Sequence, residues 1–160
     1  MGSNLALSAN CPADWPGTKP VRLVVGYAAG GGTDVIARAW GTGFQKIHGW
    51  TVVIENRPGA GSGVLMGWLK NQPADGYTLG AMSTDAVTIN PAQGDVGYTW
   101  ENFDYLGSGM QTWGGLVALK DKPFNNLKEL VEYARKQGRA TIAVAGVNQE
   151  VLVAQLAEEY

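Results

Sequence analysis

The sequence is poor in the residues on which metal sites and nucleophilic enzymes depend. Its 160 residues include one cysteine, Cys11, and one histidine, His48. A single cysteine cannot form a disulfide within the chain. A lone histidine, at the expected end of a helix, leaves zinc sites and Ser-His or Cys-His pairs without a partner. We therefore predict no catalytic residues, no metal and no cofactor.

Charged residues are also scarce, at 16% of the chain, and the formal net charge is −2. No run of basic residues is present, so nucleic acid is not an expected partner. No apolar stretch reaches the roughly 18 residues of a membrane-spanning helix. The start, Met1-Gly2-Ser3, is typical of a cloning remnant, so the lack of a signal peptide does not argue against secretion. We expect Cys11 to be a free thiol, to pair beyond residue 160 or, despite the bulky Asn10 before it, to carry a lipid.

Two short motifs of enzymes are incomplete. The glycines Gly30-Gly31-Gly32 begin a dinucleotide-binding pattern, but Val35 stands where its third glycine belongs. Ser62 lacks the preceding glycine of a nucleophile elbow, because Ala60 stands at that position. Catalysis is therefore not expected, and an α/β enzyme with catalytic residues beyond position 160 is an alternative that turnover of the ligand would reveal.

Glycine, in contrast, is abundant, with 23 residues, which indicates tight turns and close backbone approaches. Short β-branched runs at 21–25, 51–55 and 77–82 predict strands. Apolar stripes at helical spacing predict helices over 33–48 and 61–70. This alternation of strands and helices is typical of a parallel α/β sheet.

The later part of the chain predicts a less regular arrangement. We expect strands at 103–109, 116–119 and 140–145, a helix capped by Asn126 and Glu129, and a final helix from Glu150. The domain boundaries that we predict are an N-terminal arm (1–14), a first lobe (15–107) and the start of a second lobe (108–160).

A glycine-rich loop, from Gly26 to Asp34, follows the first predicted strand and leads into a helix. Unpaired backbone amides at such a junction point outward, and the positive end of the helix favours a carboxylate or a phosphate. The alternative is a tight turn between strand and helix, and composition does not decide between the two. The segment from Gly146 to Glu150 repeats the arrangement, so two junctions could hold one small ligand from opposite sides.

Four segments, in order, resemble the TctC/Bug family of periplasmic solute-binding proteins of tripartite tricarboxylate transporters. They are VVGYAAGGGTDVIAR (24–38), ENRPGAG (55–61), DGYTL (75–79) and INP (89–91). The resemblance implies an α/β type II periplasmic binding protein, a two-lobed Venus flytrap with mainly parallel sheets, only partly present in this chain. It implies a periplasmic protein that captures a small organic acid or amino acid for membrane permease subunits. A periplasmic sensor subunit that signals to a membrane partner is the alternative.

The resemblance also implies ligand-binding residues in three loops. In the family, backbone and hydroxyl groups of the first loop and of the loop after the third strand hold a carboxylate, and a loop of the second lobe contributes more loosely. The corresponding residues are Tyr27, Ala28, Ala29, Gly30, Gly31, Gly32, Thr33 and Asp34 in the first loop, Ser83, Thr84 and Asp85 in the next, and Gly146, Val147, Asn148 and Gln149 in the second lobe.

The chain departs from the family pattern in three respects. Gly26 and Ala29 stand where prolines are usual, which predicts a less stiff first loop. Asp85 and Glu150 are acidic where family loops are usually neutral, so we expect a ligand with a positive or hydrogen-donating group, or one bound with a cation. The chain is also shorter than family members. If these residues were the whole polypeptide, an exposed sheet edge would predict self-association.

Overall fold

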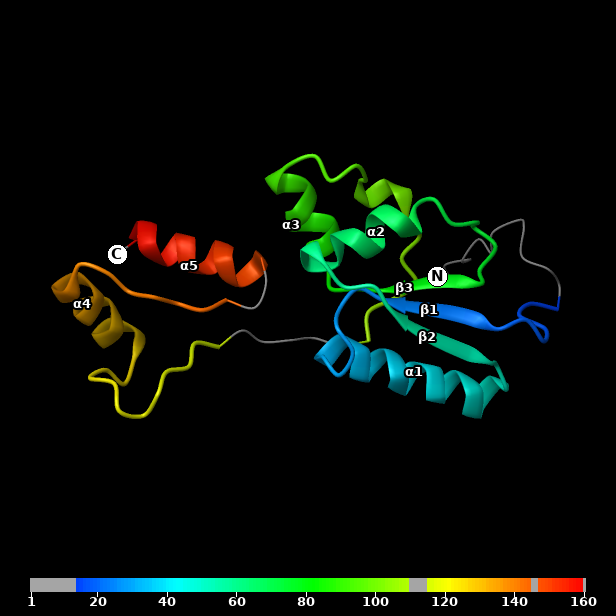
Figure 1. Ribbon diagram of the computed structural model, residues 1–160, viewed down its shortest axis with the longest axis horizontal. Helices are drawn as coiled ribbons and strands as arrows, with labels where there is room; N and C mark the ends of the chain where they lie inside the picture. The colour runs from blue at the N-terminus through cyan, green and yellow to red at the C-terminus, as the bar shows by residue number, and fades with distance from the viewer. Residues whose placement is uncertain (1–13, 110–114, 145–146, 160) are drawn as a thin grey trace, which may run out of the picture. The chain divides into compact units, whose positions relative to one another are not determined.

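Strand β1 (Val21–Val25) lies at the centre of the sheet in the computed structural model, which describes residues 14–109, 115–144 and 147–159 (Figure 1). It pairs in parallel with β2 (Val52–Asn56) and with β3 (Thr78–Ala81), in the order β2-β1-β3. Four of the five β1 residues are buried, because helices cover both faces of the strand. The predicted α/β fold with a parallel sheet is confirmed.

The register of the sheet brings the carboxyl ends of the three strands to one level. Val25 lies opposite Asn56 on one neighbour and opposite Ala81 on the other. The segments that follow the three strands therefore leave the sheet at the same edge. Ligands of open parallel sheets usually bind at this edge, so the fold itself directs attention to these segments.

Helix α1 (Gly32–His48) covers one face of the sheet, where Leu23, Val25, Ala37 and Ala81 form a buried cluster (Figure 1). Gly41 allows α1 to approach β2 closely, since a Cβ there would lie 3.2 Å from Ile54 Cδ1. The helix ends at Gly49, whose φ of 70° permits its N–H to donate to the carbonyl of Gln45.

The opposite face carries α2 (Gly63–Leu69) and α3 (Asp85–Gln93), with the short 3-10 helices η1 (Ala60–Ser62) and η2 (Trp100–Asn102). A second buried cluster fills this side of the sheet. Its members are Val24, Leu65, Met66, Ala86, Val87 and Tyr98. Because Val24 points away from its neighbours Leu23 and Val25, the strand contributes to both clusters.

Aromatic side chains hold the segment before β1 against the amino ends of the neighbouring strands. The ring of Trp15 meets that of Trp50 edge to face, with centroids 4.9 Å apart. The hydroxyl of Tyr77 donates to the carbonyl of Pro16 over 3.1 Å. These contacts join residues 15–16 to the amino ends of β2 and β3, at the end of the sheet opposite to the carboxyl ends of the strands.

The chain forms two units, the first ending at Gly107 and the second beginning at Ser108. The second unit contains α4 (Leu127–Gln137) and α5 (Val147–Glu159). Asn126 accepts a hydrogen bond from the Glu129 amide over 3.0 Å, and Gly138 ends α4 in the left-handed conformation. The predicted cap of this helix is confirmed. No helix among the described residues is both long and apolar enough to cross a membrane.

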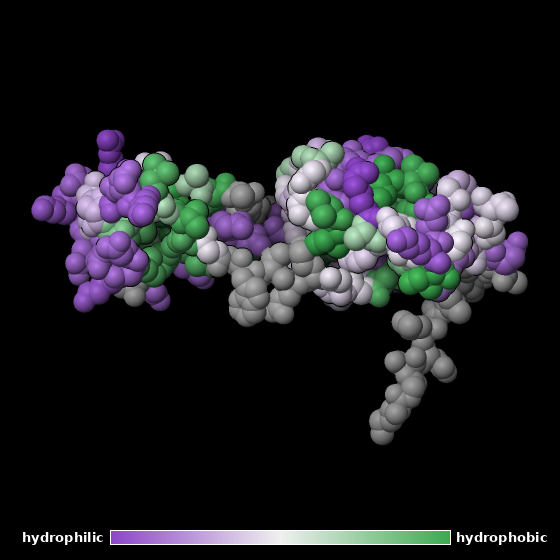
Figure 2. Space-filling view, turned by 90° about the horizontal axis from the view of Figure 1, so that it is seen from below, coloured by the Kyte–Doolittle hydropathy of each residue, from purple (hydrophilic) through white to green (hydrophobic). Residues whose placement is uncertain are grey.

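Three predicted strands are wrong. Residues 103–109, 116–119 and 140–144 are described and contain no strand, and residue 145 lies outside the described ranges. A β-branched run becomes a strand only when a partner strand accepts its backbone hydrogen bonds, and among the described residues these three segments have no such partner. Several large apolar side chains of this unit are accordingly exposed, and Figure 2 shows hydrophobic residues gathered beside hydrophilic ones. They are Leu116, Val117, Leu119, Leu127, Val144, Val151 and Leu152.

Candidate ligand-binding site

Two loops meet at the carboxyl edge of the sheet. The first joins β1 to α1, and the second leads from β3 into α3. The hydroxyl groups of Tyr27 and Ser83 form a hydrogen bond that links them, although 56 positions separate the two residues. Tyr27 and Ser83 are half-buried, whereas Ala28, Ala29 and Thr84 are exposed. The structure therefore brings together the two groups of first-unit residues that the sequence predicts.

The Asp34 side chain is the anchor of the first loop. It is 1% exposed, and its Oδ2 accepts hydrogen bonds from the Gly30 amide at 2.8 Å and from Arg38 Nε at 2.9 Å. Its Oδ1 accepts from Asn56 Nδ2 at 2.8 Å. The Arg38 guanidinium, the Gly30 amide and the Asn56 amide together hold the pKa of Asp34 well below its usual range. The carboxylate thus fixes the conformation of the loop through these hydrogen bonds, and both of its oxygens already have donors.

Asn56 connects this anchor to the sheet. The Nδ2 of Asn56, the last residue of β2, donates to Asp34 and also to the carbonyl of Tyr27, at 3.0 Å. The backbone amide of Arg57 donates to the carbonyl of Val25 at 2.7 Å. The sequence prediction did not include Arg38 or Asn56 among the site residues. The signal for Asn56 was the ENR segment at the end of a strand, but its partner Asp34 lies 22 positions earlier in the chain.

The backbone amides of the loop fall into two groups. Those of Gly30 and Gly31 already donate within the loop, to Asp34 Oδ2 and to the carbonyl of Ala28. Those of Gly32, Thr33 and Asp34 belong to the first turn of α1, where an amide has no carbonyl of its own helix to bind. Gly31, which precedes the helix, has no side chain to cap them. Because Asp34 is buried, the amides of Gly32 and Thr33 and the positive end of the helix dipole are the groups available to an anion.

The second loop ends at Thr84 and Asp85, where α3 begins. Thr84 is helical in conformation, and its side chain makes no capping hydrogen bond. Asp85 is buried, and its Oδ1 has no hydrogen-bond partner among the described residues. The loop therefore adds a hydroxyl at Ser83 and a buried carboxylate at Asp85 to the same edge of the sheet.

The predicted residues of the second unit are only partly described. Gly146 lies outside the described residues, Val147 is the first residue of α5, and Asn148 and Gln149 are exposed in the first turn of that helix. Glu150 is also exposed. The predicted start of this helix at Glu150 is wrong, because α5 begins three residues earlier and Val147, Asn148 and Gln149 form its first turn instead of a loop.

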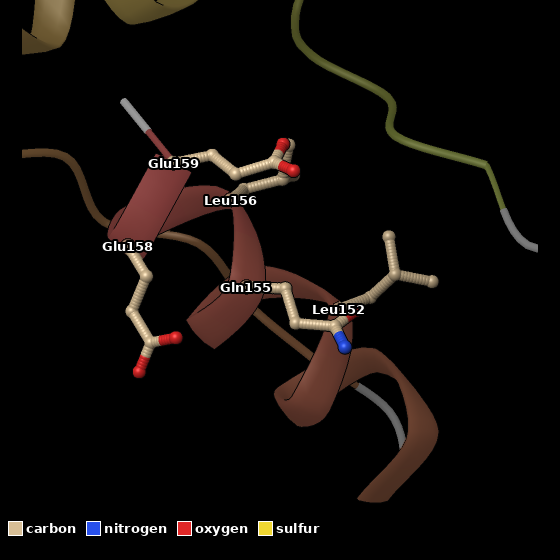
Figure 3. A pocket seen from close by; sticks show the side chains of 5 residues that line it. All are labelled: Leu152, Gln155, Leu156, Glu158 and Glu159. Carbon is tan, nitrogen blue, oxygen red and sulfur yellow. The ribbon is translucent and has the colours of Figure 1, made fainter.

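A shallow hollow of about 480 Å³ lies on α5 (Figure 3). A single helix lines it, with Leu152, Gln155, Leu156, Glu158 and Glu159. One helix cannot enclose a ligand, and two glutamates at its rim disfavour an anion. Within the described ranges, no group of three or more His, Cys, Asp or Glu side chains is placed to hold a metal ion. The carboxyl edge of the sheet is therefore the better candidate site.

The depressed pKa of Asp34 predicts an acid-sensitive first unit. A carboxylate whose pKa is lowered by folding adds stability that is complete above its unfolded pKa, about 3.9, and that is lost as the pH falls below it. We expect the urea midpoint of the wild type to exceed that of Asp34→Asn above about pH 5 and the gap to narrow toward pH 2. Urea titrations followed by circular dichroism measure it. A gap that stays constant with pH would contradict the assignment.

The sequence matches the family described as the tripartite tricarboxylate transporter family receptor, TctC, over residues 36–159. A relative from Cupriavidus necator, the UPF0065 protein in the gbd 5' region, is 32% identical over 145 residues, which cover 88% of this chain and 43% of that protein. Protein BugT from Bordetella pertussis is 36% identical over 80 residues, covering 50% of this chain and 24% of BugT. The chain thus spans less than half the length of the relatives that it matches.

Two solved structures have similar sequences over part of the chain. The R. palustris protein Rpa4515 with adipate shares 39% identity over 42% of this chain and 22% of that chain, with a TM-score of 0.40. The periplasmic binding protein BugD shares 41% identity over 37% of this chain and 20% of BugD, with a TM-score of 0.35. The family match agrees with the predicted periplasmic-binding-protein fold, of which this chain holds a part.

Proposed function

Because the chain belongs to the TctC family, the receptors of tripartite tricarboxylate transporters, we propose that it captures a small carboxylate-bearing solute in the periplasm and delivers it to membrane permease subunits. Binding is the whole of the proposed activity, and no chemical step is part of it. The carboxyl edge of the first unit's sheet supplies the binding groups of the proposed site.

The observation that carries this proposal is the first turn of α1. The amides of Gly32, Thr33 and Asp34 have no acceptor in their own helix, and a carboxylate is the kind of group that such a turn binds. The nearest acid, Asp34, is saturated by three donors, so its charge is balanced within the loop. The hydroxyl groups of Tyr27 and Ser83 lie at the same edge and can add hydrogen bonds to the bound carboxylate.

A proline at position 32 tests whether the amides bind the carboxylate. Proline removes the N–H but suits the first position of a helix, and Gly31 before it has the extended conformation that proline requires, with φ −72° and ψ 166°. We expect Gly32→Pro to weaken binding of small dicarboxylates such as succinate or glutarate at least about tenfold, or about 1.4 kcal/mol, with no loss of folding stability. Isothermal titration calorimetry measures the affinity.

The matched control is Gly32→Ala. It keeps the amide, and no atom lies within 4 Å of the added Cβ, so its affinity should equal that of the wild type. Equal affinities of the folded Gly32→Pro and Gly32→Ala variants would show that the amide of residue 32 does not bind the solute and would count against the proposed site.

A further inference from the structure

Asp85 is a buried carboxylate without a donor. The residue is 5% exposed, and its Oδ1 is buried with no hydrogen-bond partner among the described residues. None of the ion pairs within the described part of the chain includes it. Burial of a carboxylate without a hydrogen bond costs several kcal/mol on the order-of-magnitude scale of polar burial, so such a group in a folded protein calls for an explanation.

The helix that follows does not supply the missing donor. An acid in the first turn of a helix is usually stabilised by the free amides of that turn. Here the amides of Ala86 and Val87 donate to the carbonyls of Ser83 and Thr84, each over 3.1 Å. The amide of Thr88 also donates to Thr84, over 3.1 Å. The carboxylate is therefore not explained as a local cap of α3.

Asp34 and Asp85 occupy similar positions but differ in their hydrogen-bond donors. Both acids lie in the first turn of a helix at the carboxyl edge of the sheet, and both are at least nine-tenths buried. Asp34 accepts three hydrogen bonds from Gly30, Arg38 and Asn56. Asp85, which lies two positions after the Ser83 hydroxyl that contacts Tyr27, accepts none that the described residues donate. The described residues thus donate hydrogen bonds to Asp34 and none to Asp85.

We propose that Asp85 accepts a hydrogen bond from the bound solute and selects, among small carboxylates, those that also carry an ammonium group. This inference rests on the proposed function and names the ligand class of the same site. The second carboxylate of a plain dicarboxylate would be repelled by Asp85, and more strongly where water is excluded. An ammonium group would satisfy the buried charge and balance it. Asp85 is thus a specificity-determining residue, and the start of α1 binds the carboxylate that all the candidate solutes share.

The test compares acids of equal carbon skeleton with and without an amino group, measured by calorimetry on the native polypeptide. The pairs are aspartate with succinate, glutamate with glutarate and 2-aminoadipate with adipate. We expect the wild type to prefer the amino acid of the best-binding pair at least about tenfold. Asp85→Asn should reduce that preference at least about tenfold, mainly by weaker binding of the amino acid. Asp104→Asn removes an equal charge from an exposed position of the same unit and should leave the preference unchanged.

The possible failures are distinguishable. If no acid binds to the wild type, the proposed function itself is wrong. If acids bind and the preference is absent, or is the same in Asp85→Asn, the inference about Asp85 is wrong while solute capture stands. Without ligand, Asp85→Asn should be at least as stable as the wild type, because it removes an unpaired buried charge. A less stable or unfolded variant would show that protein groups pair with the carboxylate and would also overturn the inference.

Discussion

Replacement of Gly26 by valine is expected to unfold the first unit or to destabilise it by about 3 kcal/mol or more. A Cβ at this position would lie 2.3 Å from Ser62 Oγ, 2.5 Å from Ser62 Cβ and 3.1 Å from Ser62 Cα. Neither residue can move away easily. The Gly26 amide donates to the carbonyl of Ala81 at 2.9 Å, and Ser62 is completely buried. Urea unfolding followed by circular dichroism measures the loss.

A double-mutant cycle identifies the cause. Gly26→Ala should cost at least about 1 kcal/mol less in a Ser62→Gly background than in the wild type, because the clashing side chain is then absent. Ser62 has a φ of 72°, so glycine suits its backbone. As a control, Gly43→Ala in the open middle of α1 should raise stability by up to about 1 kcal/mol. If Gly26→Val were as stable as the wild type, this would contradict the close contact between Gly26, after β1, and Ser62 of η1.

Replacement of Asp34 by alanine is expected to disorganise the loop between β1 and α1 at the candidate site. The change leaves the Gly30 amide, Arg38 Nε and the Asn56 amide without their shared acceptor. We expect Tm to fall by roughly 10 °C and binding of small carboxylates to weaken at least about tenfold. Both effects arise because the loop that positions the first turn of α1 loses its internal support. Differential scanning fluorimetry and calorimetry measure them.

Two variants bracket this prediction. Arg38→Ala should have a smaller effect, because Arg38 is about half-exposed and Asp34 keeps its bonds to Gly30 and Asn56. Asp104→Ala changes the charge at an exposed position and should leave both Tm and affinity unchanged. If Asp34→Ala bound carboxylates as the wild type does, the Asp34 network would be unnecessary for the site. If Arg38→Ala were as damaging as Asp34→Ala, the ion pair alone would explain the effect.

Local patterns in the sequence were sufficient for most elements of the first unit. The run VRLVV has the composition of a strand buried on both faces, and it is the central strand β1. The cap by Asn126 and Glu129 depends on residues three positions apart and is present as predicted. The glycine-rich loop was also placed correctly between a strand and a helix. These features depend on neighbours in the chain, so periodicity and spacing predict them.

The tertiary structure decided the roles of individual residues within that frame. Gly26 was interpreted as a source of flexibility, yet its lack of a side chain makes room for Ser62, 36 positions away. Asp34 was predicted as a ligand contact, and this stays a prediction. In the structure both oxygens of its carboxylate accept hydrogen bonds from protein groups, one of which is Asn56 at the end of β2. The strands expected in the second unit failed because they have no partner among the described residues. In each case the deciding contact comes from a distant part of the chain, and sequence spacing carries no information about which distant group will arrive.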